Sequence, residues 1–211
     1  MQLRLYYFHD PMCSWCWAFR PLWNEIVTNL PENVSAQRIL GGLAPDTDQS
    51  MPLEMQARLK EIWQKIQQVV PGTQFNFEFW EKCSPRRSTY QACRAVIAAR
   101  NQDPVNEEKM ILAIQQAYYL KAKNPADLQT LIDLADQIGL DGDRFIADIK
   151  SPNVDQLLMQ EIEFMQSLGV RGFPTLLLES KGVFTNLHYE YQNVSSVLNQ
   201  LKEFHDRYSE S

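Results

Sequence analysis

The chain has 211 residues, of which 45% are hydrophobic and 22% are charged, so it can bury an ordinary core and is not disordered as a whole. Its formal net charge of −6 argues against binding to nucleic acid, because neutralising phosphates requires a basic face. No apolar run is long enough to cross a membrane and no signal-peptide core follows Met1, so we expect a cytoplasmic protein that does not associate with membranes.

The beginning of the chain is predicted to form a strand, a helix and a second strand. Residues 3–8 are apolar and rich in aromatic side chains, which is typical of a short buried strand, and Pro11 ends it. Over residues 14–30 apolar side chains recur at helical spacing. Residues 34–40 have strand character again, and two glycines close this second strand.

A long helical stretch follows, because periodic apolar segments alternate with Pro, Gly and Asn residues that end helices. The predicted helices cover residues 51–70, 88–100, 106–121, 126–138, 142–150 and 153–168. Strand character returns only at residues 175–178 and 183–189, with a turn at Lys181 and Gly182 between them. A last helix is predicted over residues 194–208.

This order is β-α-β, a helical block, then β-β-α. It predicts an α/β protein with the thioredoxin fold, in which a mixed central sheet carries a large all-helical insertion. Both ends of the helical block return to the same sheet. We therefore expect a thioredoxin-like domain formed by residues 1–43 and 169–211, and a helical insertion domain formed by residues 44–168.

Cys13 and Cys16 form a Cys-x-x-Cys motif between the first strand and the first helix. At the start of a helix the unpaired N–H groups and the helix dipole favour negative charge, so the thiolate form of Cys13 is stabilised. Cys16 lies one turn further on and can resolve a mixed disulfide. In a reducing compartment, a close pair of this kind indicates redox catalysis.

Two other interpretations of these cysteines are weaker. A zinc site needs two more ligands, but Cys83 and Cys93 are far apart in sequence and the three histidines are scattered, so no metal site is predicted. A pair of inert buried cysteines is disfavoured by the turn-like residues Pro11 and Ser14 around the motif. Cys83 and Cys93 themselves are interpreted as ordinary thiols of the interior.

A second motif, Val-Arg-Gly-Phe-Pro-Thr at residues 170–175, stands directly before the third strand. Proline removes one backbone N–H there, while the N–H and C=O of Phe173 can pair with an extended substrate. An ordinary proline at the start of a strand would give the same local pattern. The upstream Cys-x-x-Cys favours a substrate-binding role for Phe173 and Pro174.

These motifs resemble those of the DsbA family, and more closely its cytoplasmic branch of FrnE-like, predicted protein-disulfide isomerases. The resemblance rests on residues 6–17, 84–89 and 170–175 and on the helical insertion, and it follows the whole chain in element order. It implies a protein-disulfide oxidoreductase or isomerase that exchanges dithiols and disulfides with protein or peptide substrates and needs no cofactor. It also implies that Cys13 attacks, that Cys16 resolves, and that Pro174 is a cis-proline beside them.

The two residues between the cysteines, Ser14 and Trp15, differ from the Pro-His pair of periplasmic DsbA. Trp15 offers no charge to stabilise a thiolate, so we expect a weaker oxidant, within a known range of about −120 to −270 mV. Trp15 and Phe173 would form an apolar rim for a peptide. Ser14 and His9 are candidates for tuning the reactivity of Cys13, and a hydrogen-bonded strand-end histidine is an equal alternative for His9.

The same fold is shared by kappa-class glutathione transferases and 2-hydroxychromene-2-carboxylate isomerases, which bind glutathione and lack the paired cysteines. A glutathione-dependent transferase or isomerase is therefore the alternative function. Arg86, with Arg87 beside it, is a candidate for binding a glutathione carboxylate or another substrate anion, and a solvated pair at a helix start is an equal interpretation. As partners we expect protein or peptide thiols and disulfides, with glutathione left open as a co-substrate, in a monomer or weak homodimer.

Overall fold

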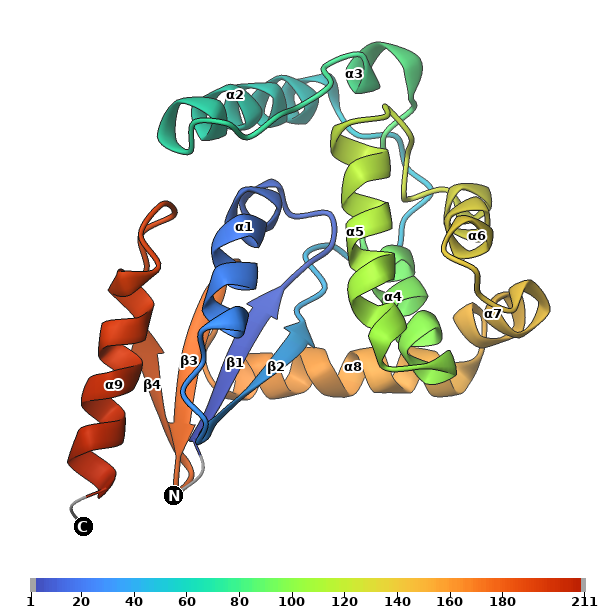
Figure 1. The fold of residues 1–211 in the computed structure, drawn as a ribbon. Helices are drawn as coiled ribbons and strands as arrows, with labels where there is room; N and C mark the ends of the chain where they lie inside the picture. Colours follow the sequence, from blue (N-terminus) through green and yellow to red (C-terminus); the bar gives the residue numbers. More distant parts are fainter. Residues whose placement is uncertain (1–2, 210–211) are drawn as a thin grey trace.

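The computed structural model describes residues 3–209, and within that range the strands form a four-stranded sheet in the order β2-β1-β3-β4 (Figure 1). β1 (Leu3–His9) pairs in parallel with β2 (Val34–Leu40), and α1 (Ser14–Thr28) connects them. Parallel neighbours require such a crossover, so α1 packs on one face of the sheet. Its N-terminus lies near the end of β1.

The other half of the sheet comes from the end of the chain. β3 (Thr175–Ser180) pairs antiparallel with β1, and β4 (Val183–Leu187) pairs antiparallel with β3. The turn between them uses Lys181 and Gly182, both at positive φ. α9 (Ser195–Ser209) follows and shares a hydrophobic cluster with α1. The predicted thioredoxin fold, with its mixed sheet, is therefore confirmed.

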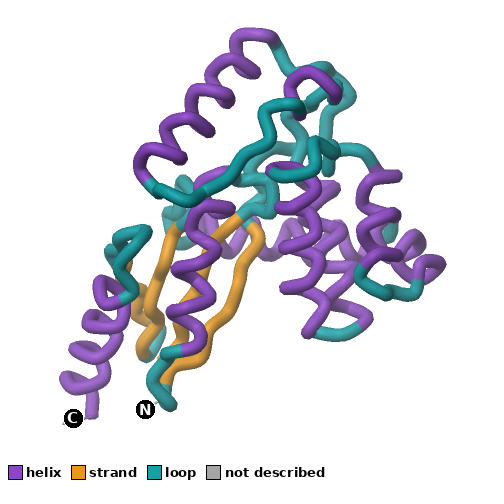
Figure 2. Tube along the Cα trace, turned by 45° about the horizontal axis from the view of Figure 1, so that its top comes forward, coloured by secondary structure: helices purple, strands orange, loops and turns teal. Residues whose placement is uncertain are grey.

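Between β2 and β3 the described chain is helical, as predicted. Figure 2 shows these helices gathered beside the sheet and above one of its ends. Their bounds are α2 (Leu53–Val69), α3 (Phe79–Lys82), α4 (Tyr90–Gln102), α5 (Val105–Tyr119), α6 (Leu128–Gln137), α7 (Gly142–Ile149) and α8 (Pro152–Ser167). The single turn α3 was not predicted. No helix of residues 3–209 combines the length and the apolar character that crossing a membrane would require.

The sheet separates two hydrophobic cores because side chains alternate between its faces. Leu5 and Tyr7 pack with α1 and α9 on one face. Tyr6 and Phe8 share a cluster with the insertion helices on the other face, where the ring centroid of Phe164 in α8 lies 5.4 Å from that of Tyr6. Figure 1 shows α8 running past the sheet toward the other insertion helices. The insertion thus buries one face of the sheet.

Charged residues also join the insertion to the sheet. The Glu108 carboxylate of α5 accepts hydrogen bonds from Arg20 of α1 and from Arg38 of β2. Arg100 of α4 donates to Glu161 of α8 at 2.5 Å, and the other oxygen of that carboxylate accepts from the Leu40 N–H of β2 at 2.6 Å. Because ion pairs of this kind are partly desolvated, they fix the relative position of these elements more than they add net stability.

Candidate active site

Cys13 is the N-cap residue of α1, at the point where the chain turns after β1. Pro11 cannot continue the β ladder, and the turn is closed by a hydrogen bond from the Cys13 N–H to the Asp10 carbonyl at 3.0 Å. The Cys13 carbonyl accepts from the Trp17 N–H at 3.0 Å, which begins the helix. The Cys13 sulfur therefore stands at the positive end of the α1 dipole, where a thiolate is stabilised.

Cys16 lies one helical turn further on and is completely buried, whereas 7% of the Cys13 surface is exposed. Both are free thiols. Burial, and after it the neighbouring Cys13, raise the pKa of the Cys16 thiol well above its ordinary value. The pair therefore combines a more accessible sulfur at the helix start with a protonated sulfur behind it.

The segment before β3 faces Cys13. The Phe173–Pro174 peptide bond is cis, and the Cys13 thiol donates to the Phe173 carbonyl across a distance of 3.7 Å between Sγ and O. The Tyr189 hydroxyl donates to the Pro174 carbonyl at 3.0 Å. The structure thus brings Phe173 and Pro174 to the cysteines, although 160 residues separate Phe173 from Cys13.

The Phe173 ring rests against the backbone of Gly41, directly after β2. A Cβ atom added to Gly41 would lie 1.9 Å from Cζ of that ring, far inside contact distance. Only a residue without a side chain leaves space for the ring in this position. The contact therefore fixes one side of the site.

A small pocket of about 190 Å³ opens beside Cys13. Ser14, Trp15 and Phe173, which the sequence analysis singled out, are among its lining residues. The remaining wall is mostly apolar or aromatic and comes from the loop after β2, from α2 and from α5, as Leu43, Leu59, Ile62, Trp63 and Tyr118. Such a wall suits an apolar side chain. Within residues 3–209 no cluster of His, Cys, Asp and Glu is arranged to hold a metal ion.

The cation at this pocket is Arg87 and not Arg86. The Arg86 guanidinium instead donates to the Asp127 carboxylate at 2.6 Å and to the Ala126 carbonyl. These partners hold it against the loop before α6. The structure therefore does not bring Arg86 to this pocket, and its guanidinium is paired inside the insertion.

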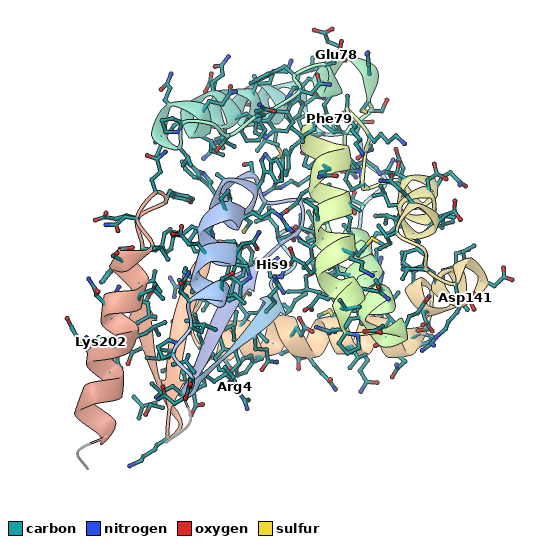
Figure 3. All side chains as sticks on the ribbon, viewed as in Figure 1. Arg4, His9, Glu78, Phe79, Asp141 and Lys202 are labelled. Atoms are coloured by element: carbon teal, nitrogen blue, oxygen red, sulfur yellow. The ribbon has the colours of Figure 1, made fainter. Side chains whose placement is uncertain are left out.

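His9 ends β1 and lies between α1 and α5 (Figure 3). It is 1% exposed, and its ring stacks on that of Tyr7 with centroids 5.0 Å apart. Burial, and then the charges of nearby arginines, lower the pKa of His9 to about 3. His9 lines a cavity with Cys16 rather than the pocket of Cys13. It is therefore neutral at physiological pH and brings no positive charge to the cysteines.

The low pKa of His9 makes stability depend on pH. In the unfolded chain its pKa is 6.5, so between pH 6.5 and about 3 the unfolded state binds a proton that the folded state does not. The contribution of neutral His9 is complete above pH 6.5 and is lost as pH falls. By pH 5 the loss reaches about 2 kcal/mol.

Urea unfolding at pH 7 and pH 5 measures this loss. The His9→Gln variant cannot titrate at this position, so its free energy of unfolding should fall by about 2 kcal/mol less than that of the unsubstituted protein. His188→Gln is the control, because His188 is exposed. An equal pH dependence in the His9→Gln variant and the unsubstituted protein would contradict the prediction.

Asp10 was not predicted from the sequence, yet it organises the loop before the cysteines. Its buried carboxylate accepts from the Met12 N–H, the Leu43 N–H and the Thr89 hydroxyl, each at 2.7 Å, and the Cys93 sulfur lies 3.6 Å away. Burial raises the pKa of Asp10, while these donors lower it. Asp10 thus ties the turn after β1 to the loop after β2 and to the start of α4. The signal in the sequence was a charged residue directly after an apolar strand.

The chain is similar to known proteins over nearly its whole length. A family model described as "DSBA-like thioredoxin domain" matches residues 4–192. A structure from Nitrosomonas europaea, provisionally described as a protein disulfide isomerase, has a TM-score of 0.81 and 27% identity, and 99% of each chain is covered. The cytosolic disulfide reductase DsbM from Pseudomonas aeruginosa has a TM-score of 0.75 and 22% identity, with 98% of each chain covered. DsbM has also been solved with GSH.

Curated relatives carry a different description. The ClpXP adapter protein SpxH from Halalkalibacterium halodurans is 23% identical, over 96% of this chain and 68% of its own length. SpxH from Bacillus subtilis is also 23% identical, over 93% of this chain and 66% of its own length. The chain therefore spans about two thirds of the length of these relatives.

Proposed function

The chain belongs to the DSBA-like thioredoxin domain family, and from this premise we propose that it is a thiol–disulfide oxidoreductase for protein or peptide substrates. The observation that carries the proposal is the position of the Cys13 sulfur at the N-terminus of α1, 3.7 Å from the Phe173 carbonyl. The buried Cys16 thiol lies one turn behind it. An attacking sulfur at a helix start with a protonated thiol behind it is what dithiol–disulfide exchange requires.

The reaction takes two steps in the direction of substrate reduction. The Cys13 thiolate attacks one sulfur of a substrate disulfide, and the other sulfur leaves as a thiolate. Cys16 then loses its proton, attacks Sγ of Cys13 and releases the second substrate thiolate. The protein ends with a Cys13–Cys16 disulfide and the substrate with two thiols, so two electrons pass to the substrate. The reverse sequence oxidises a substrate dithiol.

We propose that Phe173 and Pro174 position the substrate. The Phe173 carbonyl is bonded by the Cys13 thiol in the reduced protein, and it becomes available to a substrate backbone once that thiol has reacted. Trp15 and Ser14 line the adjoining pocket, where they would contact residues that flank the substrate cysteine. The aromatic wall favours apolar flanking residues.

We also propose that the protein works in the cytoplasm, as a monomer or weak homodimer. The structurally similar DsbM is described as cytosolic, which supports the proposed compartment. On the same proposal, residues 1–43 and 169–211 form the thioredoxin-like domain and residues 44–168 the insertion domain. The lining of the pocket supports a site formed by both domains, because Cys13 belongs to the thioredoxin-like domain and Trp63 to the insertion domain.

Glutathione is the second candidate thiol. DsbM was solved with GSH, and Arg87 places a cation at the pocket of Cys13 that could pair with a carboxylate. As a co-substrate, glutathione would reduce the Cys13–Cys16 disulfide. The alternative function, a glutathione-dependent transferase or isomerase, would not need Cys16. An adapter function, as in the names of the SpxH relatives, would need neither cysteine.

Equilibration in glutathione buffers separates these functions. The protein is incubated at a series of ratios of reduced to oxidised glutathione, alkylated and analysed by mass spectrometry. We expect one two-electron transition between the dithiol and the Cys13–Cys16 disulfide, together with catalysed reduction of insulin. Saturable glutathione binding without an internal disulfide at any ratio would contradict the proposal and favour the transferase. Binding of a client protein without any thiol–disulfide turnover would also contradict the proposal and would favour an adapter function.

A further inference from the structure

A second, much smaller cavity lies at Cys16. Its volume of about 10 Å³ corresponds to a single water position. It shares no lining residue with the pocket of Cys13, so the Cys16 side chain faces a chamber of its own. The wall comes from β1, α1, β2 and α5, and its polar groups include Tyr7, His9, Arg20, Arg38 and Glu108.

Tyr7 of β1 shares this small cavity with Cys16. The side chain is 4% exposed, and burial, followed by the neighbouring Cys16, raises the pKa of Tyr7. Neighbouring rings hold it in place, with centroids at 4.5 Å for Trp23, 5.3 Å for Phe19 and 5.0 Å for His9. The hydroxyl is therefore oriented before any reaction begins, which is the condition for effective stabilisation of a developing charge.

His9 adds a second polar group to the same cavity. Its Nε2 is buried, and nothing in the described part of the chain pairs with it. Buried polar groups of this kind normally bond to an ordered water. A water in this cavity, which His9 and Cys16 both line, would give the proton of that thiol a first acceptor.

Building on the proposed function, we propose that the Tyr7 hydroxyl is a catalytic group of the resolving step, in which it donates a hydrogen bond to the Cys16 sulfur as this becomes a thiolate. The Cys16 S–H bond breaks, and the proton passes to the cavity water and leaves past Glu108, whose side chain is 36% exposed. The Cys16 sulfur then bonds to Sγ of Cys13 while the bond from Cys13 to the substrate breaks. The substrate leaves as a thiolate that takes a proton from solvent, so charge and atoms balance.

The side chains around Cys16 do not change their protonation near neutral pH, so a pH dependence of the resolving step there reports on Cys16 itself. Burial lowers the pKa of His9 to about 3 and raises that of Tyr7 well above its ordinary value, so Tyr7 remains a donor when Cys16 is a thiolate. The pKa values of the other surrounding tyrosines are raised by the same cause, in Tyr119, Tyr189 and Tyr191. The charged groups at this cavity are Arg20 and Arg38, which pair with Glu108, while burial raises the pKa of the Cys16 thiol and the Asp10 backbone lowers it.

Tyr7→Phe tests the proposal, because it keeps the packed ring and removes only the hydroxyl. Tyr6→Phe is the matched control, since it makes the same change on the neighbouring residue, which packs on the opposite face of β1. The reduced protein is mixed with excess Ellman's reagent, a disulfide whose leaving thiolate is coloured. Attack by Cys13 releases the first coloured thiolate at a rate that rises with reagent concentration. Resolution by Cys16 releases the second coloured thiolate at a rate that does not depend on reagent concentration.

We expect Tyr7→Phe to slow the second phase about tenfold at neutral pH, the effect of losing one hydrogen bond to a charged group. The pH midpoint of that phase should move upward, while the first phase keeps its rate. Tyr6→Phe should change neither phase. An unchanged second phase in Tyr7→Phe, equal slowing of both phases, or the same slowing in Tyr6→Phe would overturn the proposal. Absence of a second phase in the unsubstituted protein would instead contradict the proposed function.

Discussion

Replacing Cys13 with serine is expected to reduce the rate of insulin reduction to that of the uncatalysed reaction. A serine hydroxyl at the same N-cap position does not form the anion that attacks a disulfide at neutral pH. Cys16 cannot take over, because its side chain is fully buried and its pKa is raised. The turbidity of insulin in the presence of a small-molecule reductant measures the rate.

Cys16→Ser is expected to fail at the second step. Cys13 still attacks, but the mixed disulfide is not resolved and accumulates as a covalent complex that a non-reducing gel detects. Cys83→Ser is the control, since Cys83 lies in the insertion with its thiol donating to the Ala122 carbonyl at 3.1 Å. Full turnover in Cys13→Ser, or lost turnover in Cys83→Ser, would refute the roles assigned to the pair.

The second large effect is expected at Asp10, on stability. Asp10→Ala leaves the N–H groups of Met12 and Leu43 and the hydroxyl of Thr89 without the carboxylate that they share. The Thr89 hydroxyl can still donate to the Ala44 carbonyl at 3.4 Å. Each of the two N–H groups left unpaired costs about 1–3 kcal/mol, so the free energy of unfolding should fall by at least about 2 kcal/mol. That is a large part of the roughly 5–15 kcal/mol that stabilises a typical domain.

Asp10→Asn distinguishes the charge of Asp10 from its shape. The amide keeps the size of the side chain but turns one acceptor into a donor that faces other donors, so we expect a smaller loss than for alanine. Urea unfolding at pH 7 measures both variants. Asp48→Asn changes an exposed aspartate of the loop between β2 and α2 and should leave stability unaltered. A loss below about 1 kcal/mol in Asp10→Ala would show that the carboxylate does not hold the loop.

The order of strands and helices could be predicted because each long element carries its own apolar period and ends at a turn residue. The exception, α3, has four residues and is too short to show a period. α4 begins at Tyr90, two residues later than predicted, because Ser88 and Thr89 belong to the preceding loop. The Thr89 hydroxyl there bonds to Asp10, and such a partner cannot be read from spacing.

The cysteines and the Phe173–Pro174 segment were recognisable because each motif stands beside a strand end. Which arginine faces the pocket was not, because the sequence does not show where each of two adjacent loop side chains points. Arg86 is directed away by its bridge to Ser50 and its pair with Asp127. Tyr7 looked like any aromatic residue of a buried strand. Only the packing of α1 above it places Tyr7 at the cavity of Cys16.

The contact between Phe173 and Gly41 makes the geometry of the site sensitive to substitution at position 41, away from the reactive sulfurs. Even one methyl group at position 41 would occupy the space of the ring, so the ring would have to swing aside. The carbonyl that the Cys13 thiol reaches belongs to this same residue and would be disturbed with it. Gly41 thus shapes the segment that we propose binds substrate, so natural selection for that segment would also act on a residue outside the Cys-x-x-Cys motif.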